Sequence, residues 1–496
     1  MVLSSCQEDN PYDGTIEGYE ILTPKPGSKP QINGPLVYGA RPGNPFLYRI
    51  PCQGERPISY AVEGLPSELT LDASTGIITG TTPSEGEYLL ALKASNSHGE
   101  AERRFKVVAG EKLALTPPMG WNYWYAHYWR ISDVMIREAA DIMISSGMAD
   151  VGYQYVNLDD CWMLKKRDSL TMDQLRDESG NVLTNKKFPD MKGLTNYIHD
   201  KGLKAGIYSS PGPLTCAQFT GSYQHEEQDA RQYADWGFDF LKYDWCSYSD
   251  IGGKDPDLEA AMKPFRKMGD LLKHQNRDIV YNLCQFAIQN AWEWGAEVGG
   301  HSWRTAGDLV YYIDELFDVA LKNATHREYS KPGEWNDPDF IMIGWFGNVK
   351  KFSAPEPTKM MPSTQYAYMS LWSLMASPIF FGGDMTKLDE FTLNILCNAD
   401  ILEVNQDPLG ESGMVIHHSD SCFLMVKNLV DGSKAVGLFN RGKEAVEVTA
   451  QWEELEVDGK QMVRDIWRQK DIGKYKEKFS AIVPAQGVVM VKISKP

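Results

Sequence analysis

Eight short apolar segments that alternate with helical patterns constrain the fold of this chain most strongly. Residues 131–148 show the first helical pattern, which begins at a capping candidate, Ser132, and ends at Gly147. Strands that alternate with helices indicate a parallel sheet, and eight such units favour a closed (β/α)₈ barrel over an open doubly wound sheet. The segments are PPMGWNYW, YQYVNLDDCW, LKAGIYSS, FDFLKYDWC, DIVYNLCQ, HSWRTAGD, EWNDPDF and SPIFFGG.

The regions on either side of these segments show sequence patterns typical of β-strands and turns. Apolar residues alternate from Tyr88 to Ala94 between turn signals, which predicts a small β-sandwich before the barrel. Alternating runs such as AVGLFN and GVVMVKI predict a C-terminal antiparallel β-domain. At 496 residues the chain is long enough for several domains. The predicted divisions are a leader at 1–32, a β-sandwich at 33–110, the barrel at 111–404 and the C-terminal β-domain at 405–496.

Charge and cysteine usage exclude several classes of function. A net charge of −17 without a basic cluster disfavours nucleic acid as a partner. The eight cysteines show no CxxC or Cys/His ligand spacing, so no metal is predicted. No GxGxxG, phosphate-binding loop or GxSxG motif occurs either, and no cofactor is expected.

The first residues, MVLSSCQEDN, leave two interpretations open. LSSC followed by acidic and polar residues resembles the cleavage box of a bacterial lipoprotein, in which Cys6 carries the lipid. The alternative is an incidental cysteine in a leader. The first interpretation predicts an exported protein, either periplasmic or tethered to the cell surface through Cys6.

Carboxylates dominate the carboxyl ends of the predicted strands, where barrels of this kind carry their function. Histidine clusters are missing from these ends, which disfavours metal-dependent hydrolysis. Two carboxylates, one ionised and one protonated, are what glycoside hydrolysis requires. The strand-end residues are Trp124, Asp159, Asp160, Tyr208, Lys242, Asp244, Cys284, Gln285, Arg304, Asp308, Asp337 and Asp339.

Asp244 in LKYDWCSY fits the ionised role. Lys242 lies two residues earlier and on the same strand face, so its ammonium is expected to lower the pKa of Asp244 and leave a nucleophile. A purely structural ion pair is the alternative. Asp308 lies at another strand end and fits the acid role.

The order of several independent motifs resembles glycoside hydrolase family 27, typified by α-galactosidases. The resemblance runs from about Leu113 to the C-terminus, and residues 33–110 are similar to immunoglobulin-like domains of bacterial surface glycosidases. The resemblance to glycoside hydrolase family 27 implies a retaining mechanism with a covalent glycosyl-enzyme intermediate. It also implies that Asp244 is the nucleophile and Asp308 the acid/base. Retaining enzymes hold these two carboxyls roughly 5–5.5 Å apart. The motifs are PPMGWNYW, YVNLDDCW, GIYSSPGPLTC, LKYDWC, WRTAGD, WNDPD, SLWSLMASPIFFGGD and NQDPLG.

The same resemblance implies the substrate contacts. Asp159 and Asp160 would accept hydrogen bonds from the O4 and O6 hydroxyls of galactose, which requires the strand to break at DDC, because adjacent strand residues face opposite ways. The alternative is that only one of them reaches the sugar. Trp124 would lie under the apolar face of the sugar, with Tyr208 and Lys242 lining the same site. Arg304 would hold the 2-hydroxyl region and the nucleophile, or form a structural salt bridge.

Three further details follow from the family pattern. Asp339 would close the site, although an aspartate next to a proline often serves only a turn. Cys216 and Cys246 would form a disulfide, which requires an oxidising compartment. The chain reads CQFA where many α-galactosidases read CEWG, so Gln285 replaces a carboxylate near the 2-hydroxyl and leaves specificity at that position open.

The interpretation favoured by the sequence is an exo-acting α-galactosidase that removes terminal α-linked galactose from oligosaccharides or polysaccharide side chains. A β-L-arabinopyranosidase is the nearest rival, but Asp160 would lose a partner if the sugar lacked its C6 hydroxymethyl group. An α-N-acetylgalactosaminidase needs a small residue near the 2-position, where Gln285 and Ile288 are large. A non-catalytic surface glycan-binding protein is the alternative from another class. Oligomeric state and linkage preference stay open.

Overall fold

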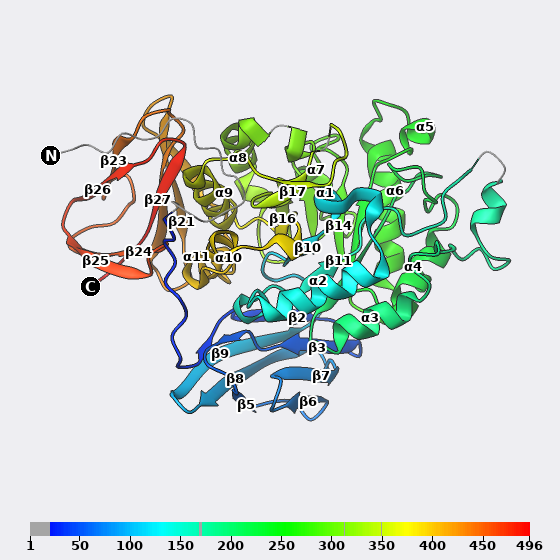
Figure 1. Ribbon diagram of the computed structural model, residues 1–496, viewed down its shortest axis with the longest axis horizontal. Coiled ribbons are helices and arrows are strands. Elements are labelled where there is room, and N and C mark those ends of the chain that lie inside the picture. Colours follow the sequence, from blue (N-terminus) through cyan, green and yellow to red (C-terminus); the bar gives the residue numbers. More distant parts are fainter. Residues whose placement is uncertain (1–19, 168–170, 312, 349) are drawn as a thin grey trace.

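The computed structural model describes residues 20–167, 171–311, 313–348 and 350–496. Three parts follow one another along the chain: a small N-terminal β-domain, a central barrel surrounded by helices, and a C-terminal pair of β-sheets (Figure 1). This is the fold class that the sequence predicts. Cys6 and the lipid-anchor prediction lie outside the described residues. In the described ranges, no helix combines the length and hydropathy needed to cross a membrane.

The N-terminal domain consists of two main sheets and one short strand pair. Alternation along its long hairpin buries Leu90, Leu92 and Ala94 in the core, as the pattern predicts, while Tyr88 is half-buried. The first sheet has the order β2 (Val37–Ala40), β9 (Gly99–Ala109), β8 (Gly86–Asn96), β5 (Ser59–Glu63); the second is β3 (Pro45–Arg49), β7 (Ile77–Thr81), β6 (Leu69–Asp72); the pair is β1 (Gln31–Ile32) and β4 (Cys52–Gln53).

Eight parallel strands form the central barrel, and each of the eight predicted segments contains one of them. A parallel bridge joins Ile341, four residues after the end of β16, to Phe381 in β19, and this bridge closes the barrel. In order the strands are β16 (Trp335–Asp337), β15 (Ser302–Arg304), β14 (Val280–Cys284), β13 (Phe240–Asp244), β12 (Lys204–Ser209), β11 (Tyr155–Asn157), β10 (Met119–Asn122) and β19 (Ile379–Phe381).

Helices surround the barrel, and short polar side chains begin several of them. Asp190, Asp257, Asp389 and Asn398 each accept a hydrogen bond from a backbone N–H in the first turn of the helix that follows. The helices are α1 (Trp124–His127), α2 (Asp133–Ser145), α3 (Met191–His199), α4 (Glu226–Trp236), α5 (Ser249–Gly252), α6 (Leu258–Lys273), α7 (Ala291–Trp294), α8 (Leu316–Ala324), α9 (Pro362–Leu374), α10 (Glu390–Leu396) and α11 (Ala399–Asn405).

The helix predicted over residues 131–148 is α2, and it begins directly after Ser132. The Ser132 side chain makes no capping hydrogen bond to this helix, and its backbone carbonyl accepts the first helical bond from Ile136. Gly147 has a φ of 85°, so it ends the helical segment in a conformation that favours glycine.

The C-terminal domain packs on the barrel through α9, which contacts β22 and β27. Because α9 lies between the barrel and this domain, its residues from Thr364 to Leu374 are all buried. The larger sheet has the order β20 (Met414–His417), β21 (Cys422–Asn428), β22 (Lys434–Asn440), β27 (Gly487–Ser494), β24 (Gln461–Asp465), β25 (Lys470–Tyr475), and the smaller sheet pairs β23 (Val446–Gln451) with β26 (Lys478–Val483).

The N-terminal domain is fixed to the amino ends of the barrel strands. Arg41 pairs with Asp278, which precedes β14, at 2.8 Å, and donates to the carbonyls of Lys273 and Arg277. Lys204, the first residue of β12, donates to the Tyr38 hydroxyl. This domain therefore lies at the end of the barrel opposite to the strand ends where the candidate site residues were predicted.

Candidate active site

Charged side chains from several strand ends meet at the carboxyl end of the barrel, and Asp159, Lys242 and Asp244 are buried there. The Lys242 ammonium on β13 lies 2.9 Å from Asp159 Oδ2, and Asn122 at the end of β10 donates to the same oxygen at 2.8 Å. Lys242 also lies over the rings of Tyr208 and Phe340. Among the described residues no ion pair joins Lys242 to Asp244, so the structural ion pair left open by the sequence is not formed: the long lysine side chain reaches Asp159 beyond the end of β11, two strands away.

Asp244 is the last residue of β13, and its two oxygens have different surroundings. Tyr208 donates from its hydroxyl to Asp244 Oδ2 at 3.1 Å. Among the described residues, Asp244 Oδ1 is buried and has no hydrogen-bond partner. A buried carboxylate oxygen without a donor is costly for a folded protein, so it marks a position where an incoming group is expected to react or bind.

Burial raises the pKa of Asp244 to about 7. Lys242 acts in the opposite direction, while the negative charges of Asp308 and Asp159 add to the increase. The sequence predicted that Lys242 would lower the pKa, and its ammonium does act that way. The predicted direction of the pKa shift was wrong. Removing the carboxylate from water raises the pKa more than the Lys242 ammonium lowers it, because the direct partner of that ammonium is Asp159.

Asp308 follows β15 and is the more accessible of the two predicted catalytic carboxylates, with 28 % of its side chain exposed. Arg304 Nη1 lies 3.2 Å from Asp308 Oδ1, and its Nη2 lies 3.2 Å from Asp339 Oδ2. Within the described residues, none of the hydrogen bonds or ion pairs of Arg304 reaches Asp244. Arg304 thus holds Asp308 in place, and the predicted contact with Asp244 is wrong in this structure.

Asp339 positions the segment that carries Asp308. Its Oδ2 accepts hydrogen bonds from Leu309 N at 2.8 Å and from the Tyr125 hydroxyl at 3.0 Å. The φ of Asp339 is 96°, an uncommon backbone conformation for a residue with a side chain. Burial raises its pKa to about 6, with Arg304 opposing. Asp339 therefore does more than complete a turn.

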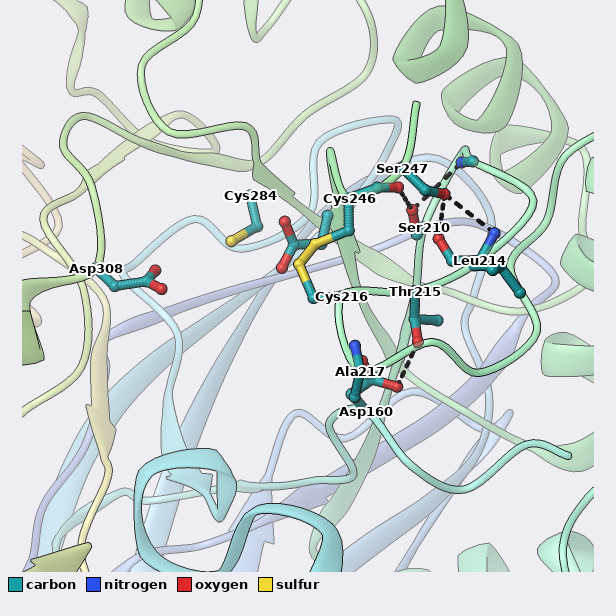
Figure 2. Close-up of a disulfide and its surroundings, with 12 residues drawn as sticks. Asp160, Ser210, Leu214, Thr215, Cys216, Ala217, Cys246, Ser247, Cys284 and Asp308 are labelled. Atoms are coloured by element: carbon teal, nitrogen blue, oxygen red, sulfur yellow. Dashed lines mark hydrogen bonds between the residues drawn. A yellow bond between two sulfur atoms is a disulfide. The ribbon is translucent and has the colours of Figure 1, made fainter. Parts of the chain in front are cut away.

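Asp159 and Asp160 both lie beyond the end of β11, which stops at Asn157. The chain has left the strand at DDC, as simultaneous access to the site requires. Asp160 accepts hydrogen bonds from Cys161 N and Ala217 N. It also accepts one from Thr215 Oγ1 (Figure 2). Burial raises the pKa of Asp160 to about 6. These bonds fix the loop after β12 that contains Cys216.

The expected disulfide between Cys216 and Cys246 is present beside this loop. A carboxylate oxygen of Asp244 and the two sulfur atoms all lie within 4.8 Å of one another. Because both sulfurs belong to the disulfide, they form part of the site wall and are not thiolate ligands for a metal. The Asp308 side chain points toward the disulfide from the opposite side of the site (Figure 2).

Gln285 and Trp124 complete the set of predicted residues. Gln285, directly after β14, is fully buried; its Nε2 lies 3.4 Å from Arg304 O, and its Oε1 has no partner in the described part of the chain. Trp124 begins α1 two residues after the end of β10, and its backbone N–H donates to Asn122 Oδ1. The polar Oε1 of Gln285 is thus a second buried acceptor without a donor.

Sequence reasoning missed three residues that build this site. Asn122 orients Asp159, Tyr125 orients Asp339, and Thr215 orients Asp160. Asn122 and Tyr125 lie in or just after the PPMGWNYW segment, so inspection of every polar side chain at that strand end could have found them. No comparable signal identified Thr215, which lies in a loop.

Comparison with known proteins gives matches along most of the chain. The model of the family described as "Alpha galactosidase A" matches residues 116–407, and that of the "Alpha galactosidase C-terminal beta sandwich domain" matches residues 420–493. A model described as "Putative Ig domain" matches residues 29–110.

Individual relatives agree with these matches. Alpha-galactosidase 2 of Arabidopsis thaliana is 34% identical over 394 residues, which are 79% of this chain and 92% of the relative. Alpha-galactosidase A of Cellvibrio japonicus is 35% identical over 409 residues, which are 77% and 93% of the two chains. A crystal structure described as a "putative alpha-galactosidase/melibiase" from Bacteroides fragilis superposes with a TM-score of 0.86 at 35% identity, covering 96% of this chain and 100% of that one.

Proposed function

The chain belongs to the α-galactosidase family, glycoside hydrolase family 27, and from that premise we propose that it is a retaining, exo-acting α-galactosidase. The observation that carries the proposal is the partnerless Oδ1 of Asp244 in a buried site whose other carboxylate, Asp308, is partly exposed. One oxygen is held by Tyr208 and the other is left for an anomeric carbon.

In the first step, Asp244 Oδ1 attacks the anomeric carbon, and Asp308 donates its proton to the leaving glycosidic oxygen. The C–O bond to the leaving group breaks as the bond to Asp244 forms, and a covalent glycosyl ester results. Burial makes the Asp244 carboxylate unfavourable, as its raised pKa records. Ester formation removes this buried charge, so burial favours attack.

In the second step, Asp308 acts as the base. It accepts a proton from water, the water oxygen attacks the anomeric carbon, and Asp244 leaves as the carboxylate. Two displacements on opposite faces restore the original configuration. Arg304 keeps Asp308 in place during both steps through its contact with Oδ1.

Recognition of a terminal sugar follows from the buried end of the site. Asp159, Lys242 and Asp244 are all buried, so charged groups close this end of the barrel. Their hydrogen-bonding groups suit the hydroxyls of one sugar ring. An arrangement that ends in a wall favours removal of a chain end over cleavage inside a polymer.

A β-L-arabinopyranosidase is the second candidate, and one observation supports it. Asp160 already accepts hydrogen bonds from Thr215, Ala217 and Cys161. Its carboxylate therefore has partners whether or not the sugar carries a C6 hydroxyl, which weakens the sequence argument for galactose.

The test is to measure hydrolysis of the nitrophenyl glycosides of α-D-galactose, β-L-arabinopyranose and α-N-acetylgalactosamine by wild type and by Asp244→Asn. We expect the α-galactoside to give the highest kcat/KM in wild type and the variant to be inactive. NMR of the first product should show the α-anomer, and a fluorinated glycosyl inactivator should label Asp244. A β-anomer, or a label on another side chain, would overturn the mechanism; no turnover of any glycoside would favour a glycan-binding protein instead.

We also propose that the protein is exported, since the disulfide beside Asp244 needs an oxidising compartment. Fractionation of the native host should place the protein outside the cytoplasm. If Cys6 carries a lipid, Cys6→Ser should move the protein from the membrane fraction to the soluble fraction. A wild-type protein found in the cytoplasm would contradict export.

A further inference from the structure

A row of aromatic rings extends from Trp124 to the molecular surface. Ring centroids lie 5.5 Å apart for Trp124 and Tyr128, 5.1 Å for Tyr128 and Phe352, and 5.6 Å for Phe352 and Trp129. Trp124 and Tyr128 are largely covered, whereas Trp129 is 49% and Phe352 40% exposed. The two exposed rings, called here the Trp129–Phe352 platform, are continuous with a residue at the carboxyl end of β10.

Two separate segments build this platform, and hydrogen bonds hold them together. Trp129 belongs to the 3₁₀ helix Tyr128–Arg130 that follows α1, and Phe352 lies between β17 (Trp345–Gly347) and β18 (Pro355–Pro357). Arg130 donates to Phe352 O at 3.0 Å and to Ser353 O at 2.5 Å. The Tyr128 hydroxyl donates to Gly347 O at 3.3 Å.

The backbone of Phe352 is held in a conformation that phenylalanine rarely adopts, with a φ of 47°. Such a conformation persists where surrounding contacts determine it, and Arg130 supplies one of these contacts. The Phe352 ring packs on Tyr128 and still keeps 40% of its surface exposed at this strained position. The arrangement is therefore expected to serve recognition.

The chemistry of the platform indicates its ligand. Aromatic faces stack on the apolar C–H faces of pyranose rings, and two neighbouring rings offer an extended surface of this kind. The Arg130 guanidinium lies 5.8 Å from the Trp129 ring and donates to backbone carbonyls. These bonds fix the two segments but leave the positive charge in place, so the preference for a neutral sugar rests on the net charge of −17, which disfavours an acidic ligand.

We propose that the Trp129–Phe352 platform binds a sugar ring of the chain to which the scissile galactose is attached. This inference rests on the proposed function and extends it, because it identifies the substrate as a galactose-substituted oligosaccharide or polysaccharide with several neutral sugar residues beyond the cleaved bond. With a terminal galactose at the buried end of the site, a leaving chain that passes Trp124 would follow the row of rings and reach the platform at the surface.

The test compares a short and a long substrate. Wild type, Trp129→Ala, Phe352→Ala and the double variant are assayed on nitrophenyl α-galactoside and on a galactose-branched mannan polysaccharide. We expect rates on the nitrophenyl glycoside to stay within about twofold, and kcat/KM on the polysaccharide to fall about tenfold in the double variant, through KM. Leu89→Ala and Ile482→Ala are matched controls, since these exposed apolar residues lie on the other two domains at 74% and 66% exposure.

The outcomes separate this inference from the proposed function. If wild type cleaves the polysaccharide and the double variant does so equally well, the platform does not bind the leaving chain. If wild type cleaves no galactoside, the proposed function fails, and retardation of the Asp244→Asn variant in gels containing the polysaccharide still reports binding. Loss of that retardation on adding Trp129→Ala supports the platform. Dimers in wild type that Trp129→Ala dissociates would instead identify a contact between copies and overturn the proposal.

Discussion

Strand β13 has a buried aspartate at each end, and the two respond to burial in opposite ways. Asp239 precedes the strand and Asp244 ends it, and both residues are 6% exposed. Asp239 lies 2.7 Å from Arg277 and 2.8 Å from His199, and it accepts a hydrogen bond from Ala205 N. Burial acts to raise its pKa, but Arg277 and His199 outweigh burial and hold the pKa well below its usual range.

At Asp244 the balance is reversed. Burial again raises the pKa, but Lys242 is engaged with Asp159, and the nearby carboxylates add to the increase, so the pKa reaches about 7. The amino end of the barrel, where the N-terminal domain docks, therefore pairs its buried charge with cations and gains stability. The carboxyl end leaves its buried charge incompletely compensated, which costs stability and makes the carboxylate reactive.

The largest effect is expected from Asp244→Asn, which tests the reactive end directly. The change keeps the side-chain shape but removes the nucleophile, so kcat on nitrophenyl α-galactoside should fall by about 10⁴-fold or more. The variant should fold, because it removes an unfavourable buried charge. A variant that retained more than a few per cent of wild-type kcat would show that another group performs the attack.

The pH dependence of stability should separate the two ends. The folded-state pKa of Asp244, about 7, lies above its unfolded value of about 3.9, so its folded form binds a proton more tightly. The stabilising contribution of Asp244 to the free energy of unfolding is fully present below about pH 4. It is lost as the pH rises toward 7, by up to about 4 kcal/mol. Asp239 has the opposite sign: its contribution is present above about pH 3.9 and is lost as pH falls toward its low folded-state pKa.

Thermal unfolding of wild type and Asp244→Asn at pH 4.5 and at pH 7.5 measures the Asp244 contribution. The variant should gain stability relative to wild type as the pH rises. Asp160 and Asp339 add the same pH dependence to both proteins, so their effect cancels in the difference. A difference between the two proteins that is constant with pH would show that Asp244 has an ordinary pKa in the folded state.

Asp239→Asn tests the compensated end. Removal of the carboxylate leaves the Arg277 guanidinium, whose side chain is 16% exposed, without its anionic partner, which should cost about 3 kcal/mol of stability. Denaturant unfolding of the barrel measures the change in its free energy of unfolding. The kcat per folded molecule should equal that of wild type. A stable variant, or a folded one with reduced kcat, would contradict the division between the two ends.

The barrel could be predicted from sequence because each buried strand is a short apolar segment. Such a segment can be recognised from the local sequence alone. The positions of Asp244, Asp308, Asp159 and Gln285 at strand ends followed from the same pattern. Their placement at one end of the barrel needed no information about loops. The disulfide came from the family resemblance and not from spacing.

The pairing of charges could not be predicted in the same way. Strand alternation correctly places Lys242 and Asp244 on one face, but the ammonium sits on a long flexible side chain and reaches Asp159 on another strand. Arg304 likewise pairs with Asp308 and Asp339, which lie beyond the ends of two different strands. Which carboxylate each cation contacts depends on the distances between strands and on burial in the folded protein. The linear sequence does not contain this information.

The smallest expected effect concerns Gln285, whose amide oxygen is a second incompletely satisfied group at the reactive end. If Oε1 accepts a hydrogen bond from the sugar 2-hydroxyl, Gln285→Leu should lower kcat/KM about tenfold on nitrophenyl α-galactoside. The same change should have little effect on the 2-deoxy analogue, which lacks that donor. Stability should be almost unchanged, because the variant also removes a buried acceptor without a partner. Equal losses on both substrates would show that Gln285 acts only by supporting Arg304, whose carbonyl its amide approaches.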